Sequence, residues 1–350
     1  MFVPYTIVNP LTIVRIRRSL PRAGDVLVHP GEAVEPAHVV AQTLLPADFR
    51  IVDVARELDV SIKRVSRCIQ VKQGDMIAEG DVVASRGGLG GQTVRSPITG
   101  TVVGTGRGRL LLEAQPIPMR LNALIPGTVV EVLPSEGVVI ETVGAHVQAV
   151  WGNGQESYGV LRVVVRAPKH PIRPKHIDAS ANGAILVGGS CIDDETLDHA
   201  IEMQVRGIVL GGVPEAMLPR LEQLSFPVIA TEGIGDIPMC QAIFDLLRSL
   251  SGRDASISGQ LRCQWGVRRP YVVVPMPSQA GNPINPEAPL GVGSRVRVLR
   301  GTYRGMSGVV SDMPKGLLLM DTGGRFPGVQ VDLGGKDTAL IPFQNLERLL

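Results

Sequence analysis

Several features that mark other classes of protein are scarce in this chain of 350 residues. Aromatic residues make up only 3% of it, and its four cysteines include no C-x-x-C pair that would indicate a zinc site or a dithiol redox site. No apolar run approaches the roughly 18 residues that predict a membrane-spanning helix. A nucleophile–base pair, a P-loop and a dinucleotide fingerprint are also missing. The sequence therefore predicts no catalytic residue, metal or cofactor, and it favours a non-enzymatic protein.

An excess of charge of one sign is missing too. The chain has 35 Lys and Arg against 33 Asp and Glu, a formal net charge of +2. This balance argues against binding of the whole chain to DNA or to a membrane surface. The apolar start is interrupted by Pro4 and Pro10, and its first basic residues follow it, so no signal peptide is expected. We expect a cytoplasmic protein with no membrane partner.

Glycine and proline are abundant instead. The chain contains 41 Gly and 27 Pro, and valine is frequent, a composition that favours many short strands joined by turns. Its length predicts more than one domain. The fold class expected from these features is a multidomain, β-rich protein with one α/β unit.

The N-terminal part contains an internal repeat. Two glycine turns with two short apolar strands, at residues 31–41, recur at residues 74–84. A second signature, Ser-Pro-Ile-Thr-Gly-Thr-Val-Val at 96–103, is echoed by Ile-Pro-Gly-Thr-Val-Val at 125–130. This combination resembles the barrel-sandwich hybrid of biotinyl and lipoyl carrier domains. The resemblance implies a barrel-sandwich-like β domain over residues 1–165.

The resemblance fails at the residue that carriers need. Biotinyl and lipoyl domains present a lysine at a hairpin tip, whereas the tip at residues 85–92 reads Ser-Arg-Gly-Gly-Leu-Gly-Gly-Gln. The guanidinium of Arg86 stays protonated and cannot replace a nucleophilic amine. A carrier function is therefore not expected.

The segment between the two copies of the repeat gives weaker signals. Val54 and Leu58 are four residues apart, with Ile51 one turn earlier, which indicates a short amphipathic helix. Residues 62–69 are interpreted as a strand with a basic, solvated face.

Strands and helices alternate in the third segment. Apolar strands are predicted at 184–187, 207–210 and 226–230, and each ends at a glycine-containing turn that leads into a helix. This order implies a parallel sheet with right-handed crossovers. We predict a small three-layer, Rossmann-like α/β domain over residues 177–262.

The turns after these strands form a candidate ligand site. Open α/β sheets bind ligands at the carboxyl ends of their strands, where exposed amides can hold an anion. The candidate ligand-binding residues are Gly188, Gly189, Ser190, Gly211, Gly212, Thr231, Glu232 and Gly233. The alternative, that glycine only permits tight turns, stays open.

The C-terminal segment carries the most specific signal. Residues 293–313 read G-S-R-V-R-V-L-R-G-T-Y-R-G-M-S-G-V-V-S-D-M, and Val296 and Val298 alternate with arginines as in a half-buried strand. The segment resembles the KOW motif of the elongation factor NusG and of ribosomal proteins. The resemblance implies an SH3-like β-barrel over residues 290–350, with RNA or the transcription or translation machinery as partner.

Arginine binds phosphate through two hydrogen bonds, and tyrosine stacks on bases or on a partner's proline. The predicted nucleic-acid- or partner-binding residues are therefore Arg295, Arg297, Arg300, Tyr303 and Arg304. These arginines can also serve only to solvate the module. The leading hypothesis is a non-enzymatic adaptor that binds RNA or a transcription or translation complex, with a protein partner also open. The alternative is a ligand-binding or enzymatic α/β domain for which the β domains are an assembly scaffold.

Overall fold

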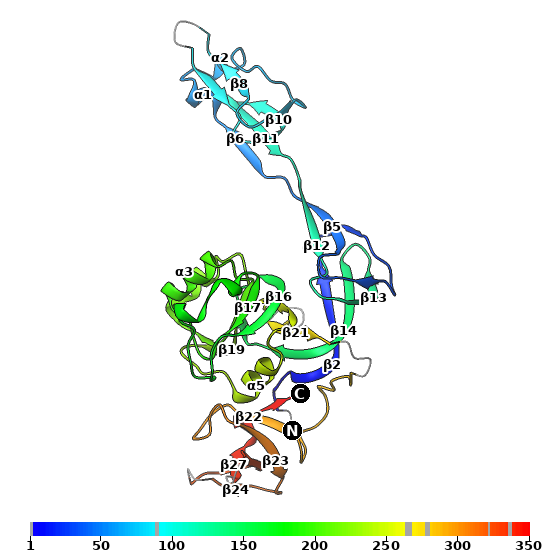
Figure 1. Cartoon of the computed structure of the whole chain (residues 1–350). Helices are drawn as coiled ribbons and strands as arrows, with labels where there is room; N and C mark the ends of the chain where they lie inside the picture. Colours follow the sequence, from blue (N-terminus) through cyan, green and yellow to red (C-terminus); the bar gives the residue numbers. More distant parts are fainter. Residues whose placement is uncertain (1–2, 88–90, 263–267, 277–280, 321–322, 335–337) are drawn as a thin grey trace.

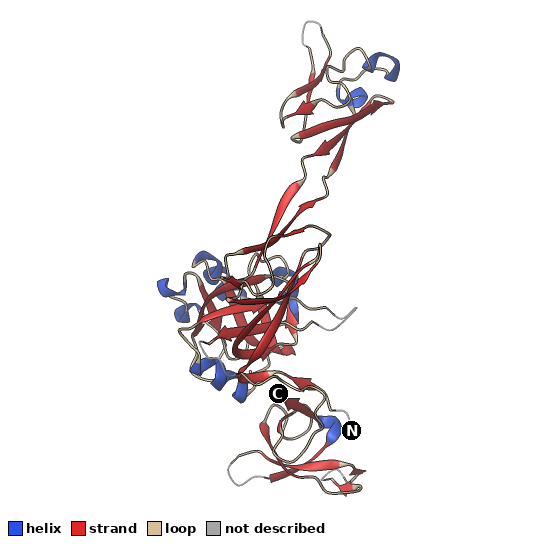
Figure 2. Ribbon diagram, turned by 90° about the vertical axis from the view of Figure 1, so that its right-hand side faces the viewer, coloured by secondary structure: helices blue, strands red, loops and turns tan. Residues whose placement is uncertain are grey.

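The computed structural model of the chain describes residues 3–87, 91–262, 268–276, 281–320, 323–334 and 338–350. The molecule is elongated: an outer module stands on a narrow neck above a central domain, and a C-terminal module lies at the opposite end (Figure 1). Strands predominate and the helices are short (Figure 2). This agrees with the predicted β-rich class. No helix within the described ranges combines the length and apolar character that crossing a membrane requires.

One mixed sheet forms the centre of the molecule, with 11 strands among the described residues. Its order is β15-β19-β18-β17-β16-β20-β21-β14-β13-β4, and β2 also pairs with β14. The bounds are β2 (Val8–Ser19), β4 (Ala33–Val34), β13 (Gly127–Leu133), β14 (Gly137–Gln148), β15 (Trp151–Gly152), β16 (Glu156–Val163), β17 (Ala184–Val187), β18 (Gly207–Val213), β19 (Val228–Ile234), β20 (Asp254–Ser258) and β21 (Tyr271–Pro275).

The predicted α/β alternation is present within this sheet. Strands β17, β18 and β19 are parallel, and they alternate with α3 (Asp194–Glu202), α4 (Leu218–Leu221) and α5 (Gln241–Ser249). The sheet nevertheless continues across the expected domain boundary at residue 165, because β16 pairs in parallel with β17. Antiparallel strands β20 and β21 then connect β16 to β14. The α/β unit and the strands that precede it therefore share one sheet.

Local sequence explains where α3 begins. The Asp193 carboxylate accepts a hydrogen bond from the Thr196 backbone N–H at 3.0 Å and so caps the helix. Two further acids in the first turn suit the positive end of the helix dipole. Leu197 and Ala200, three residues apart, bury one face of the helix against the central sheet.

The repeat builds two modules rather than one domain. The inner module uses β3 (Asp25–Val26), β4, β5 (Val39–Leu45), β12 (Ile117–Asn122) and β13, and the outer one uses β6 (Phe49–Val52), β7 (Met76–Ile77), β8 (Val82–Ser85), β9 (Thr93–Arg95), β10 (Gly100–Gly106) and β11 (Arg109–Ala114). Equivalent pairs recur, since Gly127 lies opposite Val34 and Gly100 lies opposite Ile77. Each module has its own apolar core.

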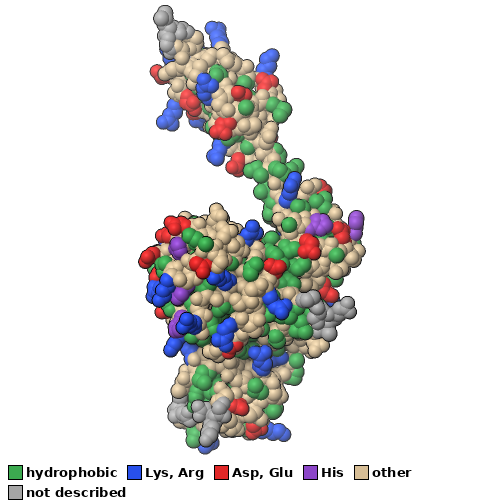
Figure 3. Space-filling model, viewed as in Figure 1, with side chains coloured by type: hydrophobic (Ala, Val, Ile, Leu, Met, Phe, Trp, Pro, Cys, Tyr) green, Lys and Arg blue, Asp and Glu red, His purple; other side chains and the backbone are tan. Residues whose placement is uncertain are grey.

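The outer module is inserted into the inner one through a two-stranded neck. Strands β5 and β12 pair antiparallel, with Leu45 opposite Ile117. Hydrophobic side chains cover much of the neck in Figure 3, and Leu44 and Ile117 there are 60% and 66% exposed. Acidic and basic side chains are interspersed over the outer module in the same view. Residues 88–90 of the predicted carrier-type tip lie outside the described residues.

One prediction in the outer module is wrong. Residues 62–69 were expected as a strand, but Ile62–Val65 form helix α2, and the turn continues with the Cys68 amide bonded to the Val65 carbonyl at 2.8 Å. Ile62, Val65 and Ile69 follow the helical period, and the three basic residues between them face solvent. The helix expected over residues 51–58 is shorter, α1 (Val54–Glu57), because Val52 already ends β6.

The C-terminal module is completed by the N-terminus of the chain. Its sheet follows the order β1-β28-β22-β23-β26-β27. The bounds are β1 (Tyr5–Thr6), β22 (Arg295–Val298), β23 (Ser307–Asp312), β26 (Gly328–Asp332), β27 (Thr338–Pro342) and β28 (Leu346–Leu349), and a separate hairpin pairs β24 (Leu318–Leu319) with β25 (Arg325–Phe326). Strand β1 runs parallel to β28, so both chain ends meet at this module (Figure 1). Within the described ranges no sheet closes into a barrel.

Acidification should destabilise the central domain through His146. This ring lies on β14, edge-on to Tyr271 with the ring centroids 5.9 Å apart, and burial lowers the pKa of His146 from 6.5 to about 4. Between these pH values the unfolded chain binds a proton that the folded chain does not. Stability present above pH 6.5 is therefore lost as the pH falls toward 4, by about 3 kcal/mol from this group.

Urea unfolding measured across this pH range provides the test. His146→Gln should flatten the dependence, whereas the exposed control His29→Gln should leave it unchanged. A pH profile that is identical in the unmodified chain and in His146→Gln would contradict the assignment.

Candidate functional site

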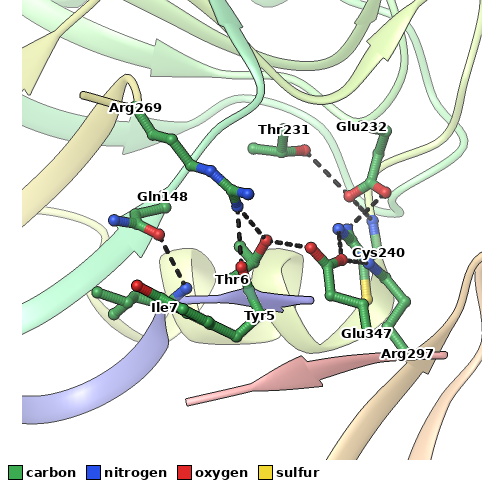
Figure 4. Close-up of polar contacts among 10 residues, drawn as sticks. All are labelled: Tyr5, Thr6, Ile7, Gln148, Thr231, Glu232, Cys240, Arg269, Arg297 and Glu347. Atoms are coloured by element: carbon green, nitrogen blue, oxygen red, sulfur yellow. Dashed lines mark hydrogen bonds and ion pairs between the residues drawn. The ribbon is translucent and has the colours of Figure 1, made fainter. Parts of the chain in front are cut away.

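The structure brings together residues from both predicted sites at the junction between the α/β unit and the C-terminal module. Glu232 comes from β19, Arg297 from β22 and Glu347 from β28 (Figure 4). The Arg297 guanidinium donates to Glu232 at 2.7 Å and, through Nε, to Glu347 at 3.0 Å. Only 4% of the Arg297 side chain is exposed. Sequence reasoning expected Arg297 to contact RNA or a partner, but its charge faces the interior between two carboxylates.

Burial and neighbouring charges act in opposite directions in this cluster. Desolvation raises the pKa of Glu232, although Arg297 and the Cys240 amide favour its charged form. Desolvation also opposes the charge on Arg297, but Glu232 and Glu347 outweigh it and raise the pKa of the guanidinium. The cluster is thus a buried carboxylate–guanidinium–carboxylate arrangement, and its charge balance depends on Arg297.

Hydrogen bonds extend the cluster on both sides. The Cys240 backbone N–H donates to Glu232 at 3.0 Å. On the other side, the Thr6 hydroxyl donates to Glu347 at 2.5 Å and accepts from Arg269 at 3.0 Å (Figure 4). The N-terminal strand, the α/β unit and the C-terminal module are therefore joined by one polar network.

Backbone carbonyls of the protein itself accept hydrogen bonds from the N–H groups of the glycine turns in the α/β unit. The Gly189 and Ser190 amides donate to the His170 carbonyl at 3.0 and 3.2 Å, and the Gly212 amide donates to the Ser190 carbonyl at 2.9 Å. The Gly188 amide is likewise bonded to Val209. These N–H groups are committed to protein carbonyls, so they do not form an exposed cradle for an anion.

The remaining turn residues have structural neighbours as well. A Cβ added at Gly211 would lie 2.4 Å from the Ile237 carbonyl oxygen, so glycine permits close backbone packing there. The Thr231 hydroxyl lies 3.3 Å from the Leu210 carbonyl and 3.2 Å from Glu232. Gly233 adopts a φ of +135°, which favours glycine. The geometry supports the structural interpretation of the glycines that the sequence left open.

The basic loop of the C-terminal module is exposed. Arg300 and Arg304 point to solvent, and Tyr303 is half-buried against the module's core. Arg295 is also exposed, and its guanidinium lies 3.4 Å from the Val8 carbonyl. Four of the five predicted binding residues are therefore accessible, and Arg297 is not.

Two cavities lie on either side of this loop. The first, of about 390 Å³, is mainly apolar and has Arg300 and Tyr303 in its wall. The second, of about 470 Å³, is polar and is lined by Glu232, Arg297 and Arg304 among others. The loop therefore presents an arginine to each cavity.

Sequence reasoning missed the apolar wall of the first cavity. Met320, Phe326 and Leu340 line it, and they come from the β24–β25 hairpin region and β27. The available signals were the run Leu317–Met320 and the isolated Phe326 among polar residues, but neither indicates which side chains come together. Phe326 is 45% exposed and Leu319 is 64% exposed.

Comparison with known proteins adds no relative. The chain matches no protein-family model, and a search among curated proteins finds no significant match.

Proposed function

We propose that the chain is a non-enzymatic adaptor whose KOW-like C-terminal module binds a protein component of the transcription or translation machinery. The observation that carries this proposal is the apolar cavity of about 390 Å³ beside the Arg300–Arg304 loop. The likeness of residues 293–313 to the KOW motif suggests the kind of assembly. The cavity favours a protein over a nucleic acid as the direct contact.

Exposed apolar side chains support a protein partner. The C-terminal module exposes six large ones near the loop and the hairpin: Met306, Val309, Leu317, Leu319, Phe326 and Leu340. Apolar surface of this kind, with an aromatic anchor and arginine, is typical of protein–protein interfaces. Nucleic-acid sites present a denser basic surface, whereas two of this module's arginines, Arg297 and Arg348, are buried.

The chemistry of the cavity indicates what it binds. Its wall contains no Asp or Glu, and Arg300 lies at one side with Arg304 on the same loop. An apolar side chain of the partner would fill the cavity, with an acidic residue next to it that pairs with the loop. Hot spots of this type often lose 2 kcal/mol or more on truncation, about a thirtyfold loss of affinity.

The N-terminal modules complete the proposed architecture. They resemble biotinyl- and lipoyl-type barrel-sandwich domains but lack the carrier lysine, and the outer one projects on its neck far from the C-terminal module (Figure 1). We assign them a spacer or assembly role within the adaptor. The α/β unit, which resembles a small Rossmann-like domain, connects the two ends.

Binding to purified RNA polymerase and to purified ribosomes of the host cell provides the test. The unmodified chain should bind one of these assemblies, and Tyr303→Ala combined with Phe326→Ala should weaken binding about thirtyfold. Ile51→Ala, at a 66% exposed apolar residue of the outer module, is the matched control and should bind normally.

Two results would contradict the proposal. One is the absence of binding to either assembly, and the other is binding that the double variant retains. Salt-sensitive RNA binding that disappears in Arg300→Ala combined with Arg304→Ala would instead assign the loop to phosphate contacts.

A further inference from the structure

The central sheet contains a second group of basic residues that the adaptor function does not use. Two cavities, of about 220 and 730 Å³, share Arg17 and Arg268 in their walls. Six arginines and two glutamates line them in total: Arg15, Arg17, Arg22, Arg262, Arg268, Arg269, Glu136 and Glu156. Guanidinium groups gathered around two neighbouring cavities attract anions.

The two carboxylates already have partners. Glu156 is partly buried, pairs with Arg18 at 2.7 Å and accepts a hydrogen bond from the Ser258 hydroxyl at 3.0 Å. Glu136 pairs with Arg17 at 2.5 Å. Arg17 is therefore paired with Glu136, and Arg15 is paired with Glu141 at 2.7 Å, whereas Arg262 and Arg268 make no ion pair within the described residues.

Two of those arginines lie directly opposite each other. Arg262 and Arg268 form an antiparallel bridge, with hydrogen bonds of 3.0 and 2.9 Å between their backbones. Side chains in such a pair lie on the same face and close together, and like charges there are destabilising. Placing two cations at this position costs stability unless an anion sits between or beside them.

Arg268 has the greatest need for an anion. It is half-buried, and in the described part of the chain its side chain makes one hydrogen bond, to the Gln260 amide oxygen at 3.2 Å, and no ion pair. Burial, followed by the charge of Arg17, lowers the pKa of the guanidinium. A guanidinium removed from water without a carboxylate is costly unless a ligand supplies the negative charge.

Neutral donors and a nonpolar wall complete the smaller cavity. Burial raises the pKa of Tyr271 to about 12, so its hydroxyl is protonated at neutral pH. Ser258 and Gln148 also line this cavity, and Val14 and Ile16 supply apolar surface. The site therefore offers charged and neutral hydrogen-bond donors in a space lined by residues of β2, β14, β16, β20 and β21.

We propose that these cavities bind a small phosphorylated molecule, with its phosphate held by Arg268 together with Arg262 and Arg17. A phosphate monoester carries close to two negative charges and accepts paired hydrogen bonds from guanidinium groups. The larger cavity, of about 730 Å³, is lined by all three of these arginines and accommodates the phosphate, and the smaller one, of about 220 Å³, accommodates the group attached to it. The site is separate from the C-terminal module and does not depend on the adaptor function.

Titration of the full chain provides the test, with inorganic phosphate, ribose 5-phosphate and a short single-stranded RNA as probes. The chloride concentration is lowered as each probe is added, so that the ionic strength stays constant. We expect saturable binding of ribose 5-phosphate, by calorimetry and by thermal stabilisation. Arg268→Gln should weaken it at least tenfold, and Arg262→Gln should weaken it by a smaller factor. Arg50→Gln, at an exposed arginine of the outer module, should leave it unchanged.

The ligand-free variants give a second measurement. Because they relieve repulsion between Arg262 and Arg268, both should be at least as thermally stable as the unmodified chain. The proposal is overturned if neither small phosphate binds saturably, if Arg268→Gln binds as well as the unmodified chain, or if only the RNA binds. The last result would assign the arginines to a nucleic-acid backbone.

Discussion

Replacing Arg297 by methionine is expected to lower the free energy of unfolding by about 3–5 kcal/mol. The substitution keeps most of the side-chain volume but leaves Glu232 and Glu347 buried without the charge that balances them; their side chains are 10% and 8% exposed. Urea or thermal unfolding would measure the loss. The loss should shrink at low pH, because burial raises the pKa of Glu232 above that in the unfolded chain, and Glu232 then binds a proton and no longer needs the charge of Arg297.

Two further variants separate the buried charge from a general effect of the substitution. Arg295→Met, two residues away on β22 and exposed, should change stability by no more than about 0.5 kcal/mol. Replacing all three members of the cluster by apolar residues of similar size should recover most of the loss, because no unpaired charge remains. If Arg297→Met costs no more than Arg295→Met, the ion cluster does not hold the C-terminal module in place.

Gly189→Ala is expected to destabilise the protein by about 3 kcal/mol, at the upper end of the range for overpacking. The added methyl would lie 2.4 Å from the Ala167 carbonyl oxygen and 2.7 Å from the His170 carbonyl oxygen. Both neighbours are backbone atoms that cannot rotate away, so the segment around Pro168 must shift. Thermal unfolding of the purified variant without any added ligand would show the effect.

The matched control is Gly104→Ala in β10, where an added methyl meets nothing within 4 Å. It should stay within about 0.5 kcal/mol of the unmodified chain. A variant Gly189→Ala with unchanged stability would show that this turn is looser than its contacts indicate. That result would favour the alternative interpretation, in which the glycine turns bind a ligand.

Short-range patterns predicted the local structure well in several places. The alternation of strands and helices from residue 184 follows from apolar runs that end in glycine and from acids such as Asp193 at the helix starts. The strand over residues 295–298 follows from alternating valine and arginine. The repeat correctly indicated equivalent short strands, β4 and β5 in one copy and β7 and β8 in the other, although it could not indicate that each copy belongs to a separate module.

The candidate site was predictable only in part. Arg300, Tyr303 and Arg304 were recognised because all three residues belong to one short motif. The structure places them on one accessible loop. The apolar cavity beside them depends on Phe326 and Leu340, which reach it through the packing of the module. The role of Arg297 also differed, since its partner Glu232 lies 65 residues away in sequence.

The sequence by itself determined the short strands, the glycine turns, the helix caps and the internal repeat, because each depends on residues within a few positions of one another. Only the tertiary structure decided that β1 pairs with β28, that β16 joins the α/β sheet, and that Arg17 and Arg268 line common cavities. Local periodicity states which side of a strand is apolar, but it does not identify the partner strand. Buried charges and cavities arise from such long-range pairings, so the sites of this protein could be identified only from its tertiary structure.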